Sequence, residues 1–423
     1  MKILALFKYN KINANSLAYI LAALESSDVF YRIDVELTED VFGHLDKRSS
    51  YYDKIIVLYS VMTTQLQNYL KEFKRLKDYK RILKDKLLLV AGGPHPTGDP
   101  RGTILKLGFD VAVVGEGEET LIDILEAVLR DKPLICVEGI ALRGSREKEV
   151  VITRRRKLVD LEKYPPCSRK YGLFPPIEIM RGCPYACKYC QTPRIFSFTV
   201  RYRSVDYVKK WVKYYVQQGR RTIRFIAPNG FAYGSKTGKQ PNPEKLRLLL
   251  KEVKSIPRTR VHLGNFPSEV RPEFVTRKVL DIVAKYVVNK TLAIGAQSGS
   301  NRVLRDIGRQ HTIEDVYDAV DLALEYGFTP CVDFIFGLPG ETEEDLELTL
   351  KAIKELSSKG AVIRGHTFIP LPGTPFENAP PGKIPEHVKK ELKELKEKSV
   401  LRGEWKKQEE LALTVTRLWR SLF

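Results

Sequence analysis

Two patterns of apolar residues alternate along the first third of the chain. Apolar, β-branched runs of strand length occupy residues 2–9, 31–37, 54–61, 86–91 and 110–115. Between them, apolar residues recur at helical spacing, as in residues 16–24 and 66–73. Near-continuous apolar strands separated by helices are typical of a parallel sheet that is covered on both faces. The pattern predicts a doubly wound, Rossmann-like α/β domain over residues 1–138, with a ligand site at the carboxyl ends of its strands.

The same alternation returns in the second half of the chain. Strands are predicted near residues 177–181, 222–227, 260–266, 291–296, 331–336 and 361–369. Helices are predicted near residues 205–218, 243–254, 272–286, 313–326 and 342–357. Six consecutive βα units suit a partial (β/α)6 barrel over residues 176–376, with active groups at the carboxyl ends of its strands.

Two further segments complete the predicted organisation. Residues 139–175 read as a strand pair followed by a Pro-rich linker, and residues 377–423 as a helical C-terminal tail. Apolar residues recur at helical spacing in the tail, which predicts a docked amphipathic helix. Its aromatic and basic residues could instead stack on a nucleic acid or lie on a membrane surface. These residues are Trp405, Arg417, Trp419 and Arg420.

Length and composition bound the class of protein. The 423 residues suffice for two or three domains, and 43% hydrophobic with 29% charged residues indicates a globular chain. No apolar run approaches the roughly 18 residues that a membrane helix needs, so no membrane span is expected. Cysteine is scarce outside one short segment, which favours a reducing, cytoplasmic environment. We expect a monomer.

The net charge of +19 is unevenly distributed. Residues 1–160 have a net charge of +3, so the remainder of the chain carries +16. An excess of this size on the second half suggests an anionic substrate such as RNA. The alternative is the Lys-, Glu- and Arg-rich surface of a thermophilic protein with a basic bias.

Three of the six cysteines lie within eight positions. Cys183, Cys187 and Cys190 form a C-x3-C-x2-C array directly after a short apolar run. Closely spaced cysteines of one loop suit a 4Fe-4S cluster, and the missing fourth ligand would leave one iron open. The alternative is a zinc site, which usually takes four ligands in paired motifs.

With Arg181-Gly182 before the first cysteine and Tyr189 before the last, the array closely resembles the signature of the radical SAM superfamily. The resemblance implies that the three cysteines hold a catalytic 4Fe-4S cluster whose open iron binds S-adenosylmethionine. It also implies that Tyr189 lies against the cluster and the adenosine. Four other positions correspond to family segments that contact S-adenosylmethionine, namely Gln297, Ser298, Arg309 and Leu338. Asn229 and Gly230 occupy the place of the family's Gly-Gly-Glu motif but depart from it.

Polar and glycine-rich turns follow three strands of the first half. They contain Ser60 and Thr63, then Gly92, Gly93, Pro94 and His95, and finally Gly115, Glu116 and Gly117. Any doubly wound domain needs such turns. As a set before the cysteine array, they resemble the cobalamin-binding domain that is fused to many radical SAM enzymes. The Asp-x-His-x-x-Gly loop of other cobalamin proteins is absent, so the resemblance implies cobalamin without a protein histidine on cobalt. His95 is then a turn or pocket residue.

The combined resemblance implies a reaction class. The expected activity is transfer of a methyl group from S-adenosylmethionine through methylcobalamin to an unactivated carbon of an anionic substrate such as RNA. An electron donor such as ferredoxin or flavodoxin would reduce the cluster. The alternatives are cyclisation or carbon–carbon bond formation on a lipid or small metabolite, and a cobalamin or redox sensor. Methylthiotransferases are disfavoured, because they carry cluster-binding cysteines in their amino-terminal domain and residues 1–130 contain none.

Overall fold

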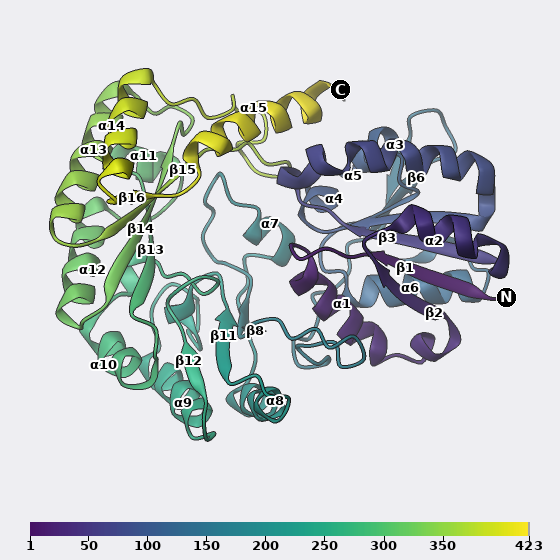
Figure 1. Cartoon of the computed structure of the whole chain (residues 1–423), viewed down its shortest axis with the longest axis horizontal. Helices are drawn as coiled ribbons and strands as arrows, with labels where there is room; N and C mark the ends of the chain where they lie inside the picture. The colour runs from purple at the N-terminus through teal and green to yellow at the C-terminus, as the bar shows by residue number, and fades with distance from the viewer. Residues whose placement is uncertain (422–423) are drawn as a thin grey trace. The chain divides into compact units, whose positions relative to one another are not determined.

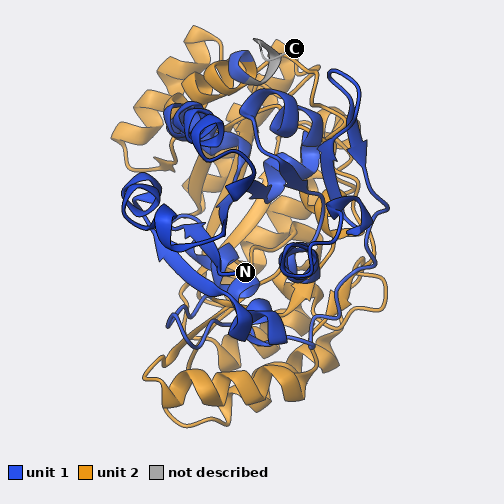
Figure 2. Cartoon of the chain, turned by 90° about the vertical axis from the view of Figure 1, so that its right-hand side faces the viewer, with its two compact units in different colours: residues 1–175, 417–423 blue, residues 176–416 orange. Residues whose placement is uncertain are grey.

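The computed structural model describes residues 1–421, with side chains through residue 418. The chain divides into two compact units, residues 1–175 with 417–423 and residues 176–416 (Figure 2). Each unit has its own sheet system and its own hydrophobic core.

The first unit is built on one seven-stranded sheet in the order β2-β1-β3-β4-β5-β6-β7 (Figure 1). The strands are β1 Ile3–Lys8, β2 Asp34–Thr38, β3 Lys54–Ser60, β4 Leu87–Gly92, β5 Val111–Val113, β6 Ile140–Arg143 and β7 Val150–Ile152. The α-helices are α1 Ala14–Glu25, α2 Val41–Arg48, α3 Leu66–Leu83, α4 Pro94–Gly98, α5 Pro100–Gly102 and α6 Glu118–Leu129. Shorter helical turns are η1 Asp28–Arg32, η2 Ser49–Tyr51, η3 Thr63–Gln65, η4 Lys84–Lys86, η5 Thr103–Leu107 and η6 Leu134–Cys136.

Helices cover both faces of this sheet. Alternate residues of β1 point to opposite faces. Phe7 packs in a core that includes Leu21 of α1 and Ile124 of α6. On the other face, Leu6 packs with Leu45 of α2 and residues of α3. The first five strands are parallel, so the predicted doubly wound fold is confirmed.

The second unit contains a run of parallel strands that curve into a partial barrel. Its strands are β8 Ile177–Glu178, β9 Met180–Arg181, β10 Arg201–Tyr202, β11 Thr222–Ile226, β12 Arg260–His262, β13 Thr291–Gln297, β14 Thr329–Phe336, β15 Val362–Thr367 and β16 Leu401–Arg402. Its helices are α7 Thr192–Phe196, α8 Val205–Gln217, α9 Pro243–Lys254, α10 Arg277–Tyr286, α11 Asn301–Asp306, α12 Ile313–Glu325, α13 Glu343–Ser358, α14 Glu386–Glu397 and α15 Trp405–Ser421, with short turns η7 Gly230–Ala232 and η8 Pro272–Phe274.

The pairing of these strands follows chain order. One group has the order β12-β11-β8, and a second has the order β13-β14-β15-β16. A single parallel bridge between Val270 and Ile294 joins the two groups. The predicted six βα units and their helices are all present, which confirms the partial barrel.

The structure differs from the predicted segments in two places. The strand pair of residues 139–175 is part of the first sheet, because β6 pairs antiparallel with β5 and β7 with β6. In the tail, Leu401–Arg402 forms β16 and extends the barrel sheet by parallel pairing with β15. A two-residue strand has no periodicity to detect, so only the pairing reveals it.

The tail is a docked helical segment. Trp405 is buried and its carbonyl oxygen accepts a hydrogen bond of 2.7 Å from the Thr367 hydroxyl. This position is incompatible with the alternative in which Trp405 stacks on a nucleic acid. The side chains of Trp419 and Arg420 lie outside the described residues. Among residues 1–421, no helix combines the length and apolarity needed to span a bilayer.

Candidate cofactor site

The loop that carries Cys183, Cys187 and Cys190 is closed at its base by a short antiparallel ladder. β9 pairs with β10, with Arg181 opposite Arg201. Gly182 follows with a φ of 86°, and a Cβ there would lie 2.2 Å from the Thr199 carbonyl oxygen. The Cys183 amide donates a hydrogen bond of 3.2 Å to the Ser197 carbonyl. Only glycine fits where the backbone at position 182 crosses the backbone at Thr199, and this crossing fixes the position of Cys183.

A buried ion-pair group lies beneath the loop. Glu178 at the end of β8 accepts hydrogen bonds from Arg181 Nε at 2.9 Å and Nη2 at 2.8 Å. Arg203 Nη2 lies 3.6 Å from the same carboxylate. All three residues are buried, so each charge has a partner within the low-dielectric interior. This group ties β8 to both strands of the ladder.

The middle of the loop docks on the segment that follows α11. The Lys188 amide donates to the Ile307 carbonyl at 2.9 Å. Gly308 has a φ of 77°, and a Cβ there would lie 3.2 Å from the Ala186 carbonyl oxygen. Cys187 Sγ lies 3.7 Å from the Gly308 carbonyl oxygen. The close approach places the residue after Gly308 beside the cysteines.

That residue, Arg309, brings a buried cation to the cysteine loop. Its Nη1 lies 3.4 Å from the Tyr189 hydroxyl and 4.0 Å from Cys187 Sγ. Its Nη2 donates to the Gly295 carbonyl at 2.5 Å. Arg309 is 7% exposed, and its buried Nε has no hydrogen-bond partner in the described structure. A cation with an unused donor beside three cysteines suits an anionic donor set and an additional ligand.

Burial disfavours the charged thiolate form at two of the three cysteines. Burial raises the pKa of Cys183 to about 11, and burial also raises the pKa of Cys190. Metal binding therefore requires loss of thiol protons. Among the described side chains, no three His, Cys, Asp or Glu residues converge as a single metal ion would require. A four-iron cluster distributes its cysteine ligands over several irons. Three cysteines of one loop beside a buried arginine fit such a group.

The structure brings Tyr189, Leu338, Gln297 and Arg309 to one region. Tyr189 packs against an apolar cluster that contains Leu338 and Ile307. Gln297 ends β13 in a left-handed conformation with a φ of 78°, at an irregularity in the pairing of β13 with β14. A Cβ on Gly295 would lie 2.7 Å from Gln297 Nε2 and 3.3 Å from Arg309 Nη2. These residues are neighbours although they come from four separate segments.

Ser298 has a different role. It is fully buried, and its hydroxyl lies 3.4 Å from the Thr349 hydroxyl of α13. The same oxygen accepts a hydrogen bond of 3.1 Å from the Ser300 amide. Ser298 therefore fastens the turn after β13 to α13, and its hydroxyl is not presented on the surface of the site.

Asn229 and Gly230 lie after β11 in a close backbone crossing. A Cβ on Gly230 would lie 2.6 Å from the Ser268 carbonyl oxygen, so glycine is required there. The Asn229 side-chain oxygen accepts from the Phe231 amide at 3.3 Å. Its Nδ2 is buried without a hydrogen-bond partner among the described residues. An unused amide donor suits the acceptor group of a ligand.

In the first unit, the carboxyl ends of β3 and β4 form a glycine-lined rim. Ser60 pairs with Gly92 in the register of these strands. Gly93 has a φ of 106°, and a Cβ there would lie 3.0 Å from the Val61 carbonyl oxygen and 3.5 Å from Ser60 Oγ. Pro94 then begins α4. The turn itself therefore requires glycine at position 93, because neighbouring backbone occupies the place of a side chain.

Thr63 and His95 support this rim from within. Thr63 is 2% exposed and His95 is 1% exposed, and their Oγ1 and Nδ1 atoms lie 3.1 Å apart. Burial lowers the pKa of His95 to about 4, so the ring is neutral at physiological pH. Gln65, two residues after Thr63, has a buried Oε1 atom with no hydrogen-bond partner in the described part of the chain. His95 does not present its ring to the outside of the rim.

The turn after β5 completes the rim. Gly115 has a φ of 90°, and its amide donates to the Thr97 hydroxyl at 3.1 Å. Glu116 is buried and accepts from the Val159 amide at 2.8 Å, so it fastens the segment that follows β7. A Cβ on Gly117 would lie 3.1 Å from Ile20 Cδ1. Gly115 therefore holds the turn through its backbone, and the Glu116 carboxylate is engaged in packing.

A polar cluster inside the barrel contains none of the predicted site residues. Asp333 of β14 accepts from Arg364 Nη2 at 2.5 Å and lies 3.0 Å from His366 Nε2. Gln408 Nε2 lies 3.3 Å from His366 Nδ1, and Arg364 Nη2 lies 3.4 Å from Glu269. Burial, then the charge of Asp333, raises the pKa of Glu269. The two-residue spacing of Arg364 and His366 on a predicted strand was the available signal, since it places both on one face.

A second missed group braces the cysteine loop. The Arg271 guanidinium lies 3.5 Å from the centre of the Tyr185 ring, and its Nε donates to Glu273 at 2.5 Å. The Tyr185 hydroxyl donates to the same carboxylate at 3.2 Å. Arg271 also donates to the Arg309 carbonyl. No local pattern in the sequence marks this group, because Tyr185 and Arg309 lie far along the chain from Arg271 and Glu273.

Comparison with known proteins agrees with this two-unit arrangement. Residues 177–353 match the family model of the radical SAM superfamily, and residues 5–125 match that of the B12 binding domain. The chain is similar in fold to the radical S-adenosylmethionine methyltransferase TsrM from Kitasatospora setae, solved with cobalamin and a 4Fe-4S cluster bound. The TM-score is 0.67 at 18% identity, covering 89% of this chain and 77% of TsrM.

Two curated relatives match a large part of the sequence. An uncharacterized protein of Methanopyrus kandleri is 29% identical over 345 residues, 70% of this chain and 63% of the relative. A tRNA-2-methylthio-N(6)-dimethylallyladenosine synthase of Sulfurihydrogenibium sp. is 30% identical over 238 residues, 56% of this chain and 52% of the relative. The chain therefore spans less than two thirds of the length of these two relatives.

Proposed function

Because the chain belongs to the radical SAM superfamily and carries a B12 binding domain ahead of its radical SAM domain, we propose that it is a methyltransferase acting on carbon atoms of RNA. The two domains imply three cofactors, a 4Fe-4S cluster, S-adenosylmethionine and cobalamin. When bound, the cluster supplies an electron for cleavage of S-adenosylmethionine, and cobalamin supplies a methyl carrier. The protein binds and orients these groups.

In this proposal Cys183, Cys187 and Cys190 hold the cluster. The crossing at Gly182 and the docking on Gly308 position their loop. Arg309 places a positive charge 4.0 Å from Cys187 Sγ, where it would complement the negative charge of a cysteine-bound cluster. Its unused Nε and the unused Asn229 Nδ2 are donors for the carboxylate and other acceptor atoms of S-adenosylmethionine.

The rim of the first unit holds cobalamin through backbone approach. Gly92 and Gly93 at the end of β4 and Gly115 after β5 would let cobalamin approach the backbone, and Ser60 would add a hydroxyl. His95 supports the rim from within and does not supply an imidazole to cobalt, since its ring is buried and bonded to Thr63. This arrangement would suit cobalamin that takes no imidazole from His95.

The pairing of a B12 binding domain with a radical SAM domain is the observation that carries the proposal of methyl transfer. TsrM, which has this fold, is named as a radical SAM methyltransferase and binds both cobalamin and a cluster. RNA is supported by the charge of +16 beyond residue 160 and by the name of the Sulfurihydrogenibium relative, a tRNA-modifying enzyme.

Anaerobic reconstitution tests the proposal. The full chain, loaded with iron, sulfide and cobalamin and reduced, is incubated with bulk RNA and S-adenosylmethionine that is labelled on its methyl group. We expect the label in RNA nucleosides. Mass spectrometry should locate it in a methyl group that is bound to carbon. Formation of 5′-deoxyadenosine without label in RNA would contradict methylation of RNA. Parallel incubations with lipid and small-metabolite fractions then identify any other substrate class.

Methylthiolation is the second candidate, favoured by the name of the tRNA-modifying relative. The cysteine-free segment 1–130 disfavours it, because methylthiotransferases bind a further cluster through their amino-terminal domain. The same experiment separates the two reactions. A methylthio product contains an additional sulfur atom, whereas the proposed product gains carbon and hydrogen alone.

A further inference from the structure

The positive charge of the chain is concentrated in one stretch of the radical SAM unit. Residues 205–260 contain fourteen Lys or Arg residues and three Asp or Glu residues, a net charge of +11 out of +19 for the whole chain. The stretch comprises α8, β11, α9 and the start of β12. Its charge accounts for most of the excess beyond residue 160.

These cations lie on the surface and are here called the basic face. The exposed members are Lys210, Lys213, Arg220, Arg221, Arg224, Lys236, Lys239, Lys245, Arg247, Lys251, Lys254, Arg258 and Arg260. Lys209 is half-buried. The apolar residues of α8 and α9 point inward, so the charged residues occupy the outer side of both helices.

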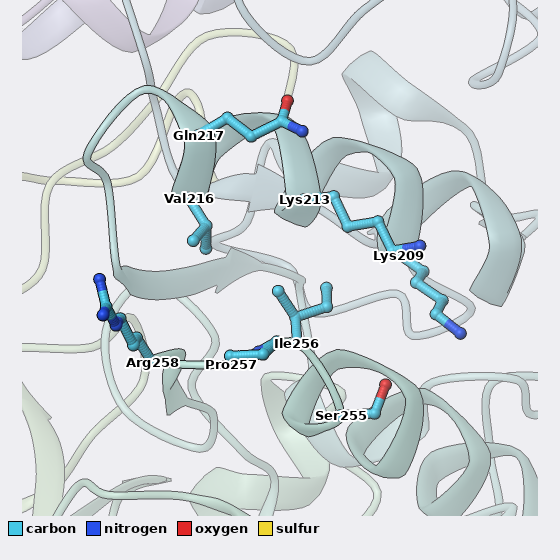
Figure 3. A pocket seen from close by; sticks show the side chains of 8 residues that line it. All are labelled: Lys209, Lys213, Val216, Gln217, Ser255, Ile256, Pro257 and Arg258. Atoms are coloured by element: carbon cyan, nitrogen blue, oxygen red, sulfur yellow. The ribbon is translucent and has the colours of Figure 1, made fainter.

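A groove of about 590 Å³ runs across this face (Figure 3). One side is formed by Lys209, Lys213, Val216 and Gln217 of α8, and the other by residues 255–258 after α9. The groove therefore combines an apolar floor with cations from two separate segments. Such a surface suits a backbone of repeated negative charges.

The local carboxylates do not neutralise these cations. Glu252 pairs with Lys209 at 2.5 Å, and its pKa is lowered by that hydrogen bond and by the charges of Lys209, Lys251 and Lys213. One carboxylate thus faces three ammonium groups. The charged helix α14 differs, because it contains four Lys and four Glu residues. A thermophilic surface gains stability from balanced opposite charges, as in α14, and a net excess of one sign has no such benefit.

The position of the basic face indicates the size of its partner. Arg220 and Arg221 immediately precede β11, and Arg260 opens β12, so these residues lie at the amino-terminal ends of the barrel strands. The cysteine loop follows β8, whose Glu178 is paired with Ile226 at the other end of β11. The strand rises ~3.3 Å per residue, which separates Thr222 from Ile226 by ~13 Å. A polymer of repeated charges can contact the amino-terminal ends of the strands while one of its units occupies the carboxyl ends.

We propose that the basic face is a docking surface for the phosphate backbone of RNA, which holds the polymer while one nucleotide occupies the site at the carboxyl ends of the strands. The assignment rests on the proposed function, because that function makes RNA the substrate. A reducing protein such as a ferredoxin is a less suitable partner for this surface. Electron transfer requires approach to the cysteine loop, and the face extends to the opposite ends of the strands.

Reversal of three surface charges tests the proposal on the full chain. The variant Lys210→Glu, Lys213→Glu, Lys251→Glu changes exposed helical residues, and Lys and Glu have similar helix propensities. The control Lys390→Glu, Lys393→Glu, Lys396→Glu makes the same change of charge on α14. Thermal melting of both variants verifies that the fold is retained.

Binding of a fluorescein-labelled RNA stem-loop is measured by anisotropy over a series of salt concentrations. For the α8–α9 variant we expect a loss of about tenfold or more in affinity, and a slope of log affinity against log salt that is smaller by about 2 to 3. The control variant should retain the wild-type slope and most of the affinity. Equal losses in both variants, or no loss in the first, would overturn the docking surface.

Two additional probes distinguish RNA from other polyanions. Polyglutamate mimics an acidic protein, and a DNA stem-loop of the same sequence has the same phosphate count. Tighter binding of either probe than of RNA would overturn the assignment to RNA.

The binding assay and the labelling assay can contradict the docking surface and the proposed reaction independently of each other. RNA binding that depends on the basic face, without methylation of RNA, would support the docking surface and contradict the proposed reaction. Methylation of RNA that is insensitive to the charge reversal at low substrate concentration would support the reaction and contradict the docking surface.

Discussion

Gly182 turns the chain between β9 and the first cysteine in a conformation that a side chain obstructs. Its φ of 86° lies in the left-handed region, and a Cβ would approach the Thr199 carbonyl to 2.2 Å. These two effects have different costs. A left-handed backbone costs a non-glycine residue about 1 kcal/mol, whereas a steric conflict with backbone forces the loop to move.

Gly182→Ala should therefore lower stability by more than about 2 kcal/mol and impair uptake of iron by the cysteine loop. Gly219→Ala is the matched control, because Gly219 has a φ of 79° and no atom within 4 Å of its Cβ position. The control substitution should lower the free energy of unfolding by only about 1 kcal/mol and leave the iron content unchanged. Chemical denaturation and iron analysis after reconstitution provide the two measurements. Equal effects of the two substitutions would show that the crossing at Thr199 is not restrictive.

At the scale of elements, the turn between β14 and α13 illustrates how a strand end is held in place. The Gly337 amide donates to Glu341 Oε2 at 2.8 Å, which closes the turn around Leu338. Glu341 Oε1 is buried without a hydrogen-bond partner among the described residues. Burial raises the pKa of Glu341 to about 8, so the carboxyl is protonated in the folded protein near neutral pH. The turn is most stable with a neutral side chain.

The free energy of unfolding should consequently depend on pH through Glu341. An unfolded Glu has a pKa of about 4.3, so the group contributes its full stability below that value and loses it as the pH rises through about 8. Glu341→Gln mimics the protonated form and should be more stable than the wild type at about pH 9 by ~2 kcal/mol, with little difference at about pH 4. Denaturant titrations at both pH values measure this. The exposed Glu347→Gln in α13 serves as the control, and a similar pH dependence for it would contradict the assignment.

At the scale of the whole molecule, the two sets of cofactor residues lie in different units. The rim residues lie between positions 60 and 117, and the cysteine-site residues lie between positions 183 and 338. Each unit has its own core, so each site can form without the other. Because the two sites are built in different units, we expect that a substitution can remove the ligand of one site without affecting the other.

Single substitutions should weaken binding of one cofactor while the other stays bound. Gly93→Ala places a Cβ 3.0 Å from the Val61 carbonyl oxygen at a φ of 106°, and should weaken cobalamin binding at least tenfold while leaving iron content unchanged. Cys183→Ser should reduce iron content and leave cobalamin binding unchanged. Visible absorbance of bound cobalamin and iron analysis are the measurements. Gly172→Ala, with a φ of 63° and no neighbouring atom within 4 Å, should preserve both ligands. Joint loss of both ligands in either variant would contradict independent sites.

Much of the fold was predictable because its information is local. The apolar runs of β1, β3 and β4 and the helical spacing of α8, α9 and α12 each extend over enough residues to reveal their period. The cysteine spacing and the glycine turns are also local, since the chemistry requires the residues of one loop. The sequence by itself therefore determined the two sheet systems, the candidate cofactors and the sign of the surface charge.

Tertiary structure alone decided which of these residues are engaged in packing. Glu116 and Ser298 belong to predicted motifs, yet each is buried and bonded to a distant segment. The cluster of Asp333, Arg364 and His366 joins two strands, and it became visible only through the pairing of β14 with β15. The basic face likewise depends on the packing of α8 against α9. Direction and proximity of side chains are set by contacts between residues far apart in the chain, and no local pattern records them.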